Sequence, residues 1–122
     1  MRQLFLIALI AIALPACATQ QEPKYISWKS HDIIYKSITL DDPIREERYS
    51  FDDHGVVALT YGKKNKWLTS PLMKWDIQHG NLRILDYDNK LFQEFRLLSR
   101  DEKGFRTTNK FNKTVYFILI QA

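Results

Sequence analysis

Hydrophobic and polar side chains alternate most clearly from Leu72 to Leu98, and turn-forming residues interrupt this alternation twice. Apolar side chains at positions 73, 75 and 77 alternate with polar ones at 74, 76 and 78, which is typical of a strand with one buried face. His79-Gly80 and Asp88-Asn89 supply residue types that tolerate the positive φ of tight turns. The stretch therefore predicts three antiparallel strands joined by two tight hairpins.

Centring the hairpins on these two pairs of residues aligns both faces of the three strands at once. A shift of one residue would bring every side chain to the opposite face, so the pattern specifies the register strongly. Opposite charges on neighbouring strands attract each other, which supports the charged row on the outer face. The predicted rows are Trp75–Ile84–Gln93 and Ile77–Leu82–Phe95 on the inner face, and Asp76–Arg83–Glu94 on the outer face.

Further short strands are predicted on both sides of this meander. Asp42-Pro43 marks a turn or the start of a single helical turn, and residues 52–55 are turn formers throughout. No long helix is predicted. The expected strand ranges are 25–40 (the first strand or two), 49–51, 56–61, 105–108 and 114–120.

The last of these strands, TVYFILI at 114–120, is apolar on both faces. It has to be central or covered, because at an exposed edge it would be prone to aggregation. Barrel closure removes sheet edges. The expected fold class is therefore all-β, a small antiparallel meander closing into a barrel, with a β-sandwich as the alternative.

A barrel of about eight strands holds side chains or one small ligand in its interior. Side chains on the inner face of the meander are the candidates to face such a ligand. Gln93 stands out among them, because a polar group on an inner face needs a hydrogen-bond partner. The predicted ligand-facing residues are Trp75, Ile84, Gln93 and Phe95.

Residues 1–16 have the features of a signal peptide. Met1-Arg2 gives a positive start, and residues 4–14 are an unbroken apolar run. A helix over this run would extend about 16 Å, against a hydrocarbon core of about 30 Å, so it is too short for a membrane span. Residues 17–24 are then expected to form a polar tether, and residues 25–122 a single domain.

The only cysteine, Cys17, stands where the signal ends. Leu14-Pro15-Ala16-Cys17 resembles the lipobox of bacterial lipoproteins, in which the cysteine becomes the lipid-modified first residue, although Pro15 replaces the usual small or aliphatic residue. The resemblance implies a lipid anchor in the bacterial cell envelope, and Ala18 in place of Asp implies the outer membrane, facing the periplasm. The alternative is an Ala-x-Ala site at 16–18, which would release a secreted or periplasmic soluble protein.

The succession of strand-like and turn-like segments in residues 25–120 resembles that of small bacterial lipocalin-like domains. The resemblance is carried by a Trp near the start, by YSFDDHGVVALTYG, and by WDI-turn-LRILD-turn-LFQEFRLLS. Lipocalins proper have Gly two residues before the first Trp, whereas Trp28 is preceded by Ile26 and Ser27. The resemblance implies a barrel able to hold a small apolar ligand.

Neither catalysis nor a metal or other cofactor is predicted. The three histidines lack metal-ligand spacing, the serines lack a nucleophile-elbow context, and there is no Gly-rich phosphate loop. Adjacent acids such as Glu46-Glu47 are expected at solvated surface positions. The protein is therefore expected not to be an enzyme.

Charge is modest in total but unevenly distributed. Without Arg2 the chain has 17 basic and 14 acidic residues, a net of +3 that does not point to a nucleic-acid partner. Residues 41–54 carry a net −4 and residues 90–113 a net +4. With Lys63, Lys64 and Lys66, the basic part is either ordinary solvated surface or a face for anionic headgroups or an acidic protein.

Two functional hypotheses follow. The first is a non-catalytic, membrane-anchored envelope lipoprotein that binds a small apolar molecule or lipid. The alternative is a protein-interaction, inhibitor, immunity or structural role. Small barrel lipoproteins that inhibit lysozyme resemble this chain in size and in expected cellular location, but the cysteine pair often found in them is absent. An open pocket near Trp75, Ile84 and Gln93 would favour the first hypothesis, and a sealed aromatic interior the second.

Overall fold

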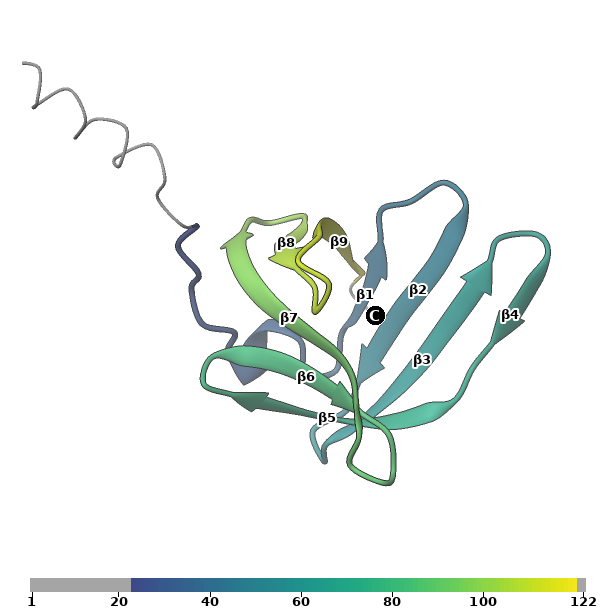
Figure 1. The fold of residues 1–122 in the computed structure, drawn as a ribbon, viewed down its shortest axis with the longest axis horizontal. Helices are drawn as coiled ribbons and strands as arrows, with labels where there is room; N and C mark the ends of the chain where they lie inside the picture. Colours follow the sequence, from purple (N-terminus) through teal and green to yellow (C-terminus); the bar gives the residue numbers. More distant parts are fainter. Residues whose placement is uncertain (1–22, 121–122) are drawn as a thin grey trace, which may run out of the picture.

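The computed structural model describes residues 23–120, and within this range the fold consists of nine strands and one short 3-10 helix (Figure 1). The predicted signal peptide and Cys17 lie outside the described residues. The 3-10 helix η1 spans Ser30–Asp32. The strands are β1 (Ser37–Leu40), β2 (Arg45–Phe51), β3 (Val56–Lys63), β4 (Trp67–Thr69), β5 (Leu72–Gln78), β6 (Asn81–Leu85), β7 (Leu91–Arg100), β8 (Gly104–Thr108) and β9 (Thr114–Ile120).

Eight of these strands close into an antiparallel barrel. They pair in the order β1–β2–β3–β5–β6–β7–β8–β9, and β9 returns to β1. The closing pair brings Ile38 opposite Leu119 and Leu40 opposite Phe117. The predicted all-β closed meander is therefore confirmed, and the sandwich alternative is not adopted.

The remaining strand, β4, continues β5 along the same edge of β3. Tyr61 pairs with Thr69 and Ala58 pairs with Leu72, which is a single register along β3. Pro71 lies between the two segments and has no N–H to donate, which accounts for the interruption. The β3–β4 hairpin forms the right-hand side of Figure 1, away from β8.

The predicted register of the central meander is confirmed. His79 and Gly80 form the first turn with φ of 54° and 81°, the positive values that such a turn requires. The observed rows are Trp75–Ile84–Gln93, Ile77–Leu82–Phe95 and Asp76–Arg83–Glu94.

The second turn differs from the tight hairpin that was predicted at Asp88-Asn89. The connection is the longer loop 86–90, and Leu85 faces Leu91. Phe92 is then an extra residue, a β-bulge that restores the register, so that Gln93 still faces Ile84.

Buried side chains fill most of the barrel interior. Tyr49, Phe95 and Phe117 are at its centre and pack edge to face, with ring centroids 5.0 to 5.9 Å apart. Trp75 and Ile84 belong to the same core. The interior near these two residues is therefore packed with side chains and is not the open pocket that the first hypothesis anticipated.

The segment before β1 contains less strand than predicted. Ile26 makes one isolated bridge, to Leu97, and the chain then turns through η1. Strand structure begins only at Ser37.

Asp42 stabilises a turn and does not begin a helix. Its Oδ1 accepts hydrogen bonds from the backbone N–H groups of Ile44 and Arg45, both at 2.8 Å. Because β2 begins at Arg45, the alternative of a single helical turn starting at Asp42-Pro43 is not adopted.

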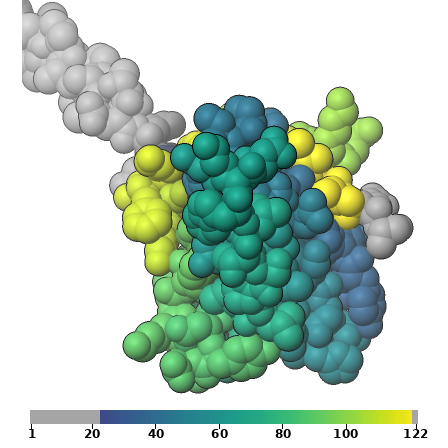
Figure 2. Space-filling model, turned by 90° about the vertical axis from the view of Figure 1, so that its right-hand side faces the viewer, coloured from purple at the N-terminus to yellow at the C-terminus, as the bar shows by residue number. Residues whose placement is uncertain are grey.

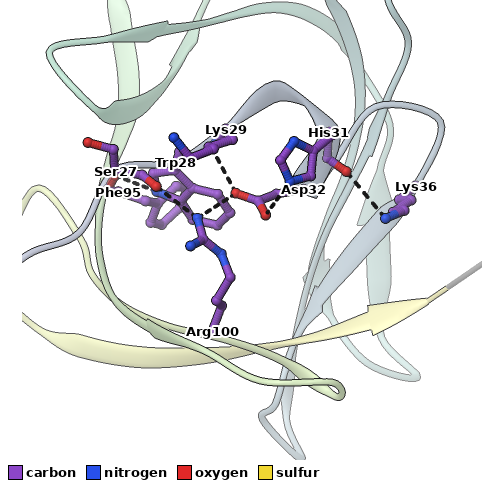
Figure 3. Close-up of polar contacts among 8 residues, drawn as sticks. All are labelled: Ser27, Trp28, Lys29, His31, Asp32, Lys36, Phe95 and Arg100. Atoms are coloured by element: carbon purple, nitrogen blue, oxygen red, sulfur yellow. Dashed lines mark hydrogen bonds and ion pairs between the residues drawn. The ribbon is translucent and has the colours of Figure 1, made fainter.

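The segment around η1 closes one end of the barrel (Figure 3). Trp28 is buried there, and its indole donates to a carbonyl of β7 at 3.0 Å. Arg100 donates to the carbonyl of Ser27 and to Oδ2 of Asp32, both at 2.8 Å. The same carboxylate accepts the backbone N–H of Lys29 at 2.8 Å, so that β7, the N-terminal segment and η1 are joined.

Strand β9 lies between β1 and β8, so both of its edges are paired. Of its side chains Phe117 is fully buried, whereas Ile118 and Ile120 on the outer face are 37% and 39% exposed. Closure therefore makes this apolar strand central, as predicted, and its outer face remains partly exposed.

Candidate ligand site at the barrel mouth

Four loops surround the end of the barrel opposite η1, which we call the mouth. They are residues 41–44, 64–66, 86–90 and 109–113, which join β1 to β2, β3 to β4, β6 to β7 and β8 to β9. Alternate connections of an antiparallel barrel lie at the same end, because successive strands run in opposite directions. Figure 2 shows the molecule from the β4 side, with the β3–β4 hairpin (teal) in front.

A pocket of about 450 Å³, the outer mouth pocket, lies between β7 and the β2–β3–β4 side of the barrel. Its apolar wall consists of Tyr61, Trp67 and Phe92, with the ring of Tyr61 6.4 Å from that of Trp67 and 6.0 Å from that of Phe92. Trp67 is 57% exposed and therefore forms the outer edge of the pocket. This size and lining are typical of a site for a small molecule.

A second pocket of about 380 Å³, the inner mouth pocket, adjoins the first. Its apolar lining includes Phe95, Phe111 and Val115. Arg45, Glu47 and Gln93 line both pockets, so the two meet across these three side chains.

Glu47 is a buried carboxylate at this meeting point. Its Oε2 accepts the hydroxyl of Tyr49 at 2.5 Å, and its Oε1 accepts a guanidinium N–H of Arg45 at 2.9 Å. Burial, together with the negative charge of Glu47, raises the pKa of Tyr49 well above its ordinary value of 10.0. The phenol therefore remains a hydrogen-bond donor, and both carboxylate oxygens have partners within the protein.

Gln93 provides a buried acceptor that has no partner. Its Oε1 is shielded from solvent, and no donor reaches it from the described part of the chain. A buried amide oxygen in this state costs about 1–3 kcal/mol. Gln93 lines both pockets, so a rotation of its side-chain amide would present this oxygen to a hydrogen-bond donor of a ligand.

The β-bulge explains why Phe92 and Gln93 both line the outer mouth pocket. Consecutive side chains of a regular strand point to opposite faces. A bulge re-aims one of them, and bulges are frequent beside functional sites for this reason. The bulge thus places an apolar ring beside the unpartnered amide.

The structure separates the four side chains that were predicted to face a ligand. Gln93 and Phe95 line the mouth pockets, whereas Ile84 is fully buried and lines neither of them. Trp75 lines a different hollow, on the barrel wall beside Arg83. Its Nε1 is buried, and a side-chain hydrogen bond from Trp75 is among the causes that lower the pKa of Asp52.

Glu47 was not among the predicted site residues, because it was expected at the surface together with Glu46. For Glu47 that expectation is wrong because β2 is a strand with an inner face, and position 47 shares this face with Tyr49 and Phe51. This alternate spacing was the available signal. Tyr61 and Trp67 were also missed as pocket residues, because the partner strands that enclose them come from distant parts of the chain.

The three lysines of the predicted basic surface lie around the loop between β3 and β4. Lys63 lines the outer mouth pocket, and Lys66 is exposed. Lys64 is half-buried, and its ammonium donates to the carbonyl of Asp42 at 2.7 Å, which joins two neighbouring loops of the mouth.

Comparisons with protein-family models, with curated proteins and with solved structures gave no significant match to this chain. Among the residues that the structure describes, no helix is long and apolar enough to cross a membrane. In the same residues, no group of three or more His, Cys, Asp or Glu side chains is arranged to hold a metal ion. The functional assignment therefore depends on the mouth and on the N-terminal sequence.

Proposed function

We propose that this protein is a non-catalytic lipoprotein of the bacterial cell envelope that binds a small, mainly apolar ligand in its barrel mouth. In this proposal Cys17 carries the lipid and anchors the domain to the periplasmic face of the outer membrane. The lipobox-like sequence supports the anchor. The single observation that carries the binding role is the unpartnered, buried Oε1 of Gln93 between two pockets with aromatic walls.

The chemistry of the mouth indicates the kind of ligand. Tyr61 and Phe92 offer apolar surface, which suits a hydrocarbon or aromatic body. Gln93 offers an acceptor, which suits a hydroxyl, amide or amine donor on that body. Glu47 is less available, because both of its oxygens already accept hydrogen bonds. The best candidate is therefore an amphiphile with one donor group.

Native mass spectrometry tests this function directly. The chain from residue 17 onward, with Cys17→Ser, would be purified gently from cells and sprayed under native conditions. We expect an additional mass of a few hundred daltons that is lost on denaturation. The variants Gln93→Leu and Trp67→Ala should lower the occupancy, because they remove the free acceptor and the outer wall of the pocket.

Leu72→Ala is the matched control. Leu72 is 60% exposed and lies on β5, and neither mouth pocket is lined by it. This variant should keep the bound mass. A bare wild-type domain after gentle purification would contradict the binding role.

The exposed edge of β4 favours a second function, the docking of a partner protein. β4 is the last strand in the sheet order, and Trp67 and Leu68 are 57% and 55% exposed there. An apolar edge strand can pair with a strand of another protein. A photo-crosslinker at position 68 of the anchored protein should then yield a defined adduct that a crosslinker at Tyr35 does not, and equal labelling from both positions would contradict this role.

A further inference from the structure

Two loops of the mouth combine lysines with an exposed aromatic ring. Lys64 and Lys66 lie in loop 64–66, and the exposed Trp67 follows them directly. In loop 109–113, Lys110 and Lys113 flank Phe111, which is 66% exposed. Neither loop contains an acidic residue. We call the exposed members the basic-aromatic rim: Lys63, Lys66, Trp67, Lys110, Phe111 and Lys113.

The two loops of the rim belong to one opening. Lys63 and Trp67 line the outer mouth pocket, and Phe111 and Lys113 line the inner one. These pockets share three lining residues, so the rim follows the edge of a continuous mouth. In Figure 2 the loop 109–113 (yellow-green) lies to the left of the β3–β4 hairpin on the same face.

The opposite end of the barrel is more acidic than the mouth. Its loops at 52–55 and 101–103 carry four acidic residues and a single lysine, Lys103, whereas the four loops of the mouth carry four aspartates and five lysines. The aspartates of the mouth lie in loops 41–44 and 86–90, outside the rim. Large apolar side chains are exposed at the mouth, at Ile44, Trp67, Tyr87 and Phe111, and at the opposite end, at Tyr35. The two ends therefore differ in charge, and the rim is where lysines and exposed aromatic rings occur together.

The start of the described chain lies beside the rim. Pro23 and Asn112 line the same shallow pocket, and Asn112 belongs to loop 109–113. Cys17 precedes Pro23 by six residues. A chain of that length reaches about 20 Å at most when fully extended. A lipid on Cys17 would therefore hold the membrane surface within reach of the rim.

We propose that the basic-aromatic rim rests on the anionic phosphate headgroups of the membrane in which Cys17 is anchored. This inference depends on the lipid anchor of the proposed function. Lysines are attracted to an anionic surface, and aromatic side chains insert at the headgroup level. In this orientation the mouth opens toward the bilayer, and an amphiphile enters it directly from the lipid.

Trp67 makes the orientation measurable. It is 57% exposed, whereas Trp28 and Trp75 are 2% and 9% exposed in the core. The acylated full-length protein would be reconstituted into vesicles of phosphatidylethanolamine and phosphatidylglycerol, with or without brominated acyl chains. We expect bromine to quench part of the tryptophan emission, and Trp67→Phe to remove that part. Unchanged emission from an anchored protein would overturn the proposal.

Charge variants test the contribution of the rim separately from the anchor. The chain from residue 17 with Cys17→Ser should bind phosphatidylglycerol vesicles and not phosphatidylcholine vesicles. Lys110→Glu combined with Lys113→Glu should weaken this binding about thirtyfold or more, because each lysine near an anionic surface contributes about a factor of five. Lys103→Glu at the opposite end is the matched control and should have no effect.

The two proposals fail in different ways. A protein that carries no lipid will not incorporate into the vesicles, which overturns the anchor but leaves the binding of the soluble chain to decide the role of the rim. A lipid-modified protein whose soluble form binds no phosphatidylglycerol, or binds it equally after charge reversal, overturns the rim and leaves the anchor intact.

Discussion

Gln93 Oε1 differs from nearly every other polar atom of the interior, since buried amide groups normally have a hydrogen-bond partner. We expect Gln93→Leu to raise the free energy of unfolding of the ligand-free domain by about 1 kcal/mol, because it removes an unpartnered acceptor. Urea denaturation of the domain after removal of the ligand bound in the mouth measures this change.

The same variant should lose the ligand that the wild-type domain carries. A gain in stability together with a loss of binding is the expected signature of a site that is completed by a ligand. Gln93→Glu serves as the comparison, because it keeps the size of the side chain and an acceptor at this position. A clear loss of stability in Gln93→Leu would show that Oε1 has a partner in solution, and would contradict the role given to it.

A second single-residue prediction concerns the closed end. Arg100→Ala removes two hydrogen bonds, to the carbonyl of Ser27 and to the carboxylate of Asp32, which is only 7% exposed. We expect a loss of about 1–3 kcal/mol in the free energy of unfolding, because Asp32 keeps its charge but loses a partner. Arg106→Ala, at an exposed position of β8, is the control that should leave the melting temperature unchanged.

At the scale of elements, the register of β5, β6 and β7 was predictable because the period-two pattern and the positive-φ turn both require the same alignment of the strands. The length of the second turn was not. Asp86 accepts the N–H groups of Asp88 and Lys90 and so stabilises a longer loop, and the bulge at Phe92 compensates for the added residue. The alternation of apolar and polar residues fits both a short turn and a longer turn followed by a bulge, so it cannot distinguish between them.

Deleting Phe92 tests the role of the bulge. The deletion leaves Leu91 opposite Leu85 and Gln93 opposite Ile84 in a regular ladder. We expect the free energy of unfolding to change by less than about 1 kcal/mol, because the lost burial of a half-exposed ring is offset by regular hydrogen bonding. Ligand occupancy in native mass spectrometry should fall, because the wall beside Gln93 is gone. Loss of cooperative unfolding would show instead that the bulge is needed for closure.

At the scale of the whole molecule, closure was predictable from one strand. The apolar pattern of β9 requires paired edges, and β1 and β8 provide them. The mouth was not predictable to the same degree. Its lining comes from β2, β3, β4, β7 and the loop 109–113, which are brought together only by closure. The irregular N-terminal segment was mispredicted because its tertiary contacts, such as the burial of Trp28, override its local pattern.

Acid should destabilise the molecule through three of its loops. Asp42, Asp52 and Asp101 each accept two backbone N–H groups, which lowers the pKa of every one of these carboxyls below its ordinary value of 3.8. The largest single contributions to the lowered pKa values are the hydrogen bonds from the N–H groups of Arg45, Val56 and Lys103. A lowered pKa in the folded state means that the stabilising effect is present above pH 3.8 and is lost as the pH falls through the folded-state values.

The melting temperature should therefore be nearly constant down to about pH 4 and should decrease below it. A triple variant, Asp42→Asn with Asp52→Asn and Asp101→Asn, retains an amide oxygen that accepts the same N–H groups, but this oxygen does not titrate. Its melting temperature should consequently depend less on pH below 4 than that of the wild type, even if it is lower at neutral pH. Thermal unfolding followed by circular dichroism between pH 2 and 7 measures both curves. Parallel curves would mean that these loops do not contribute to the acid sensitivity of the barrel.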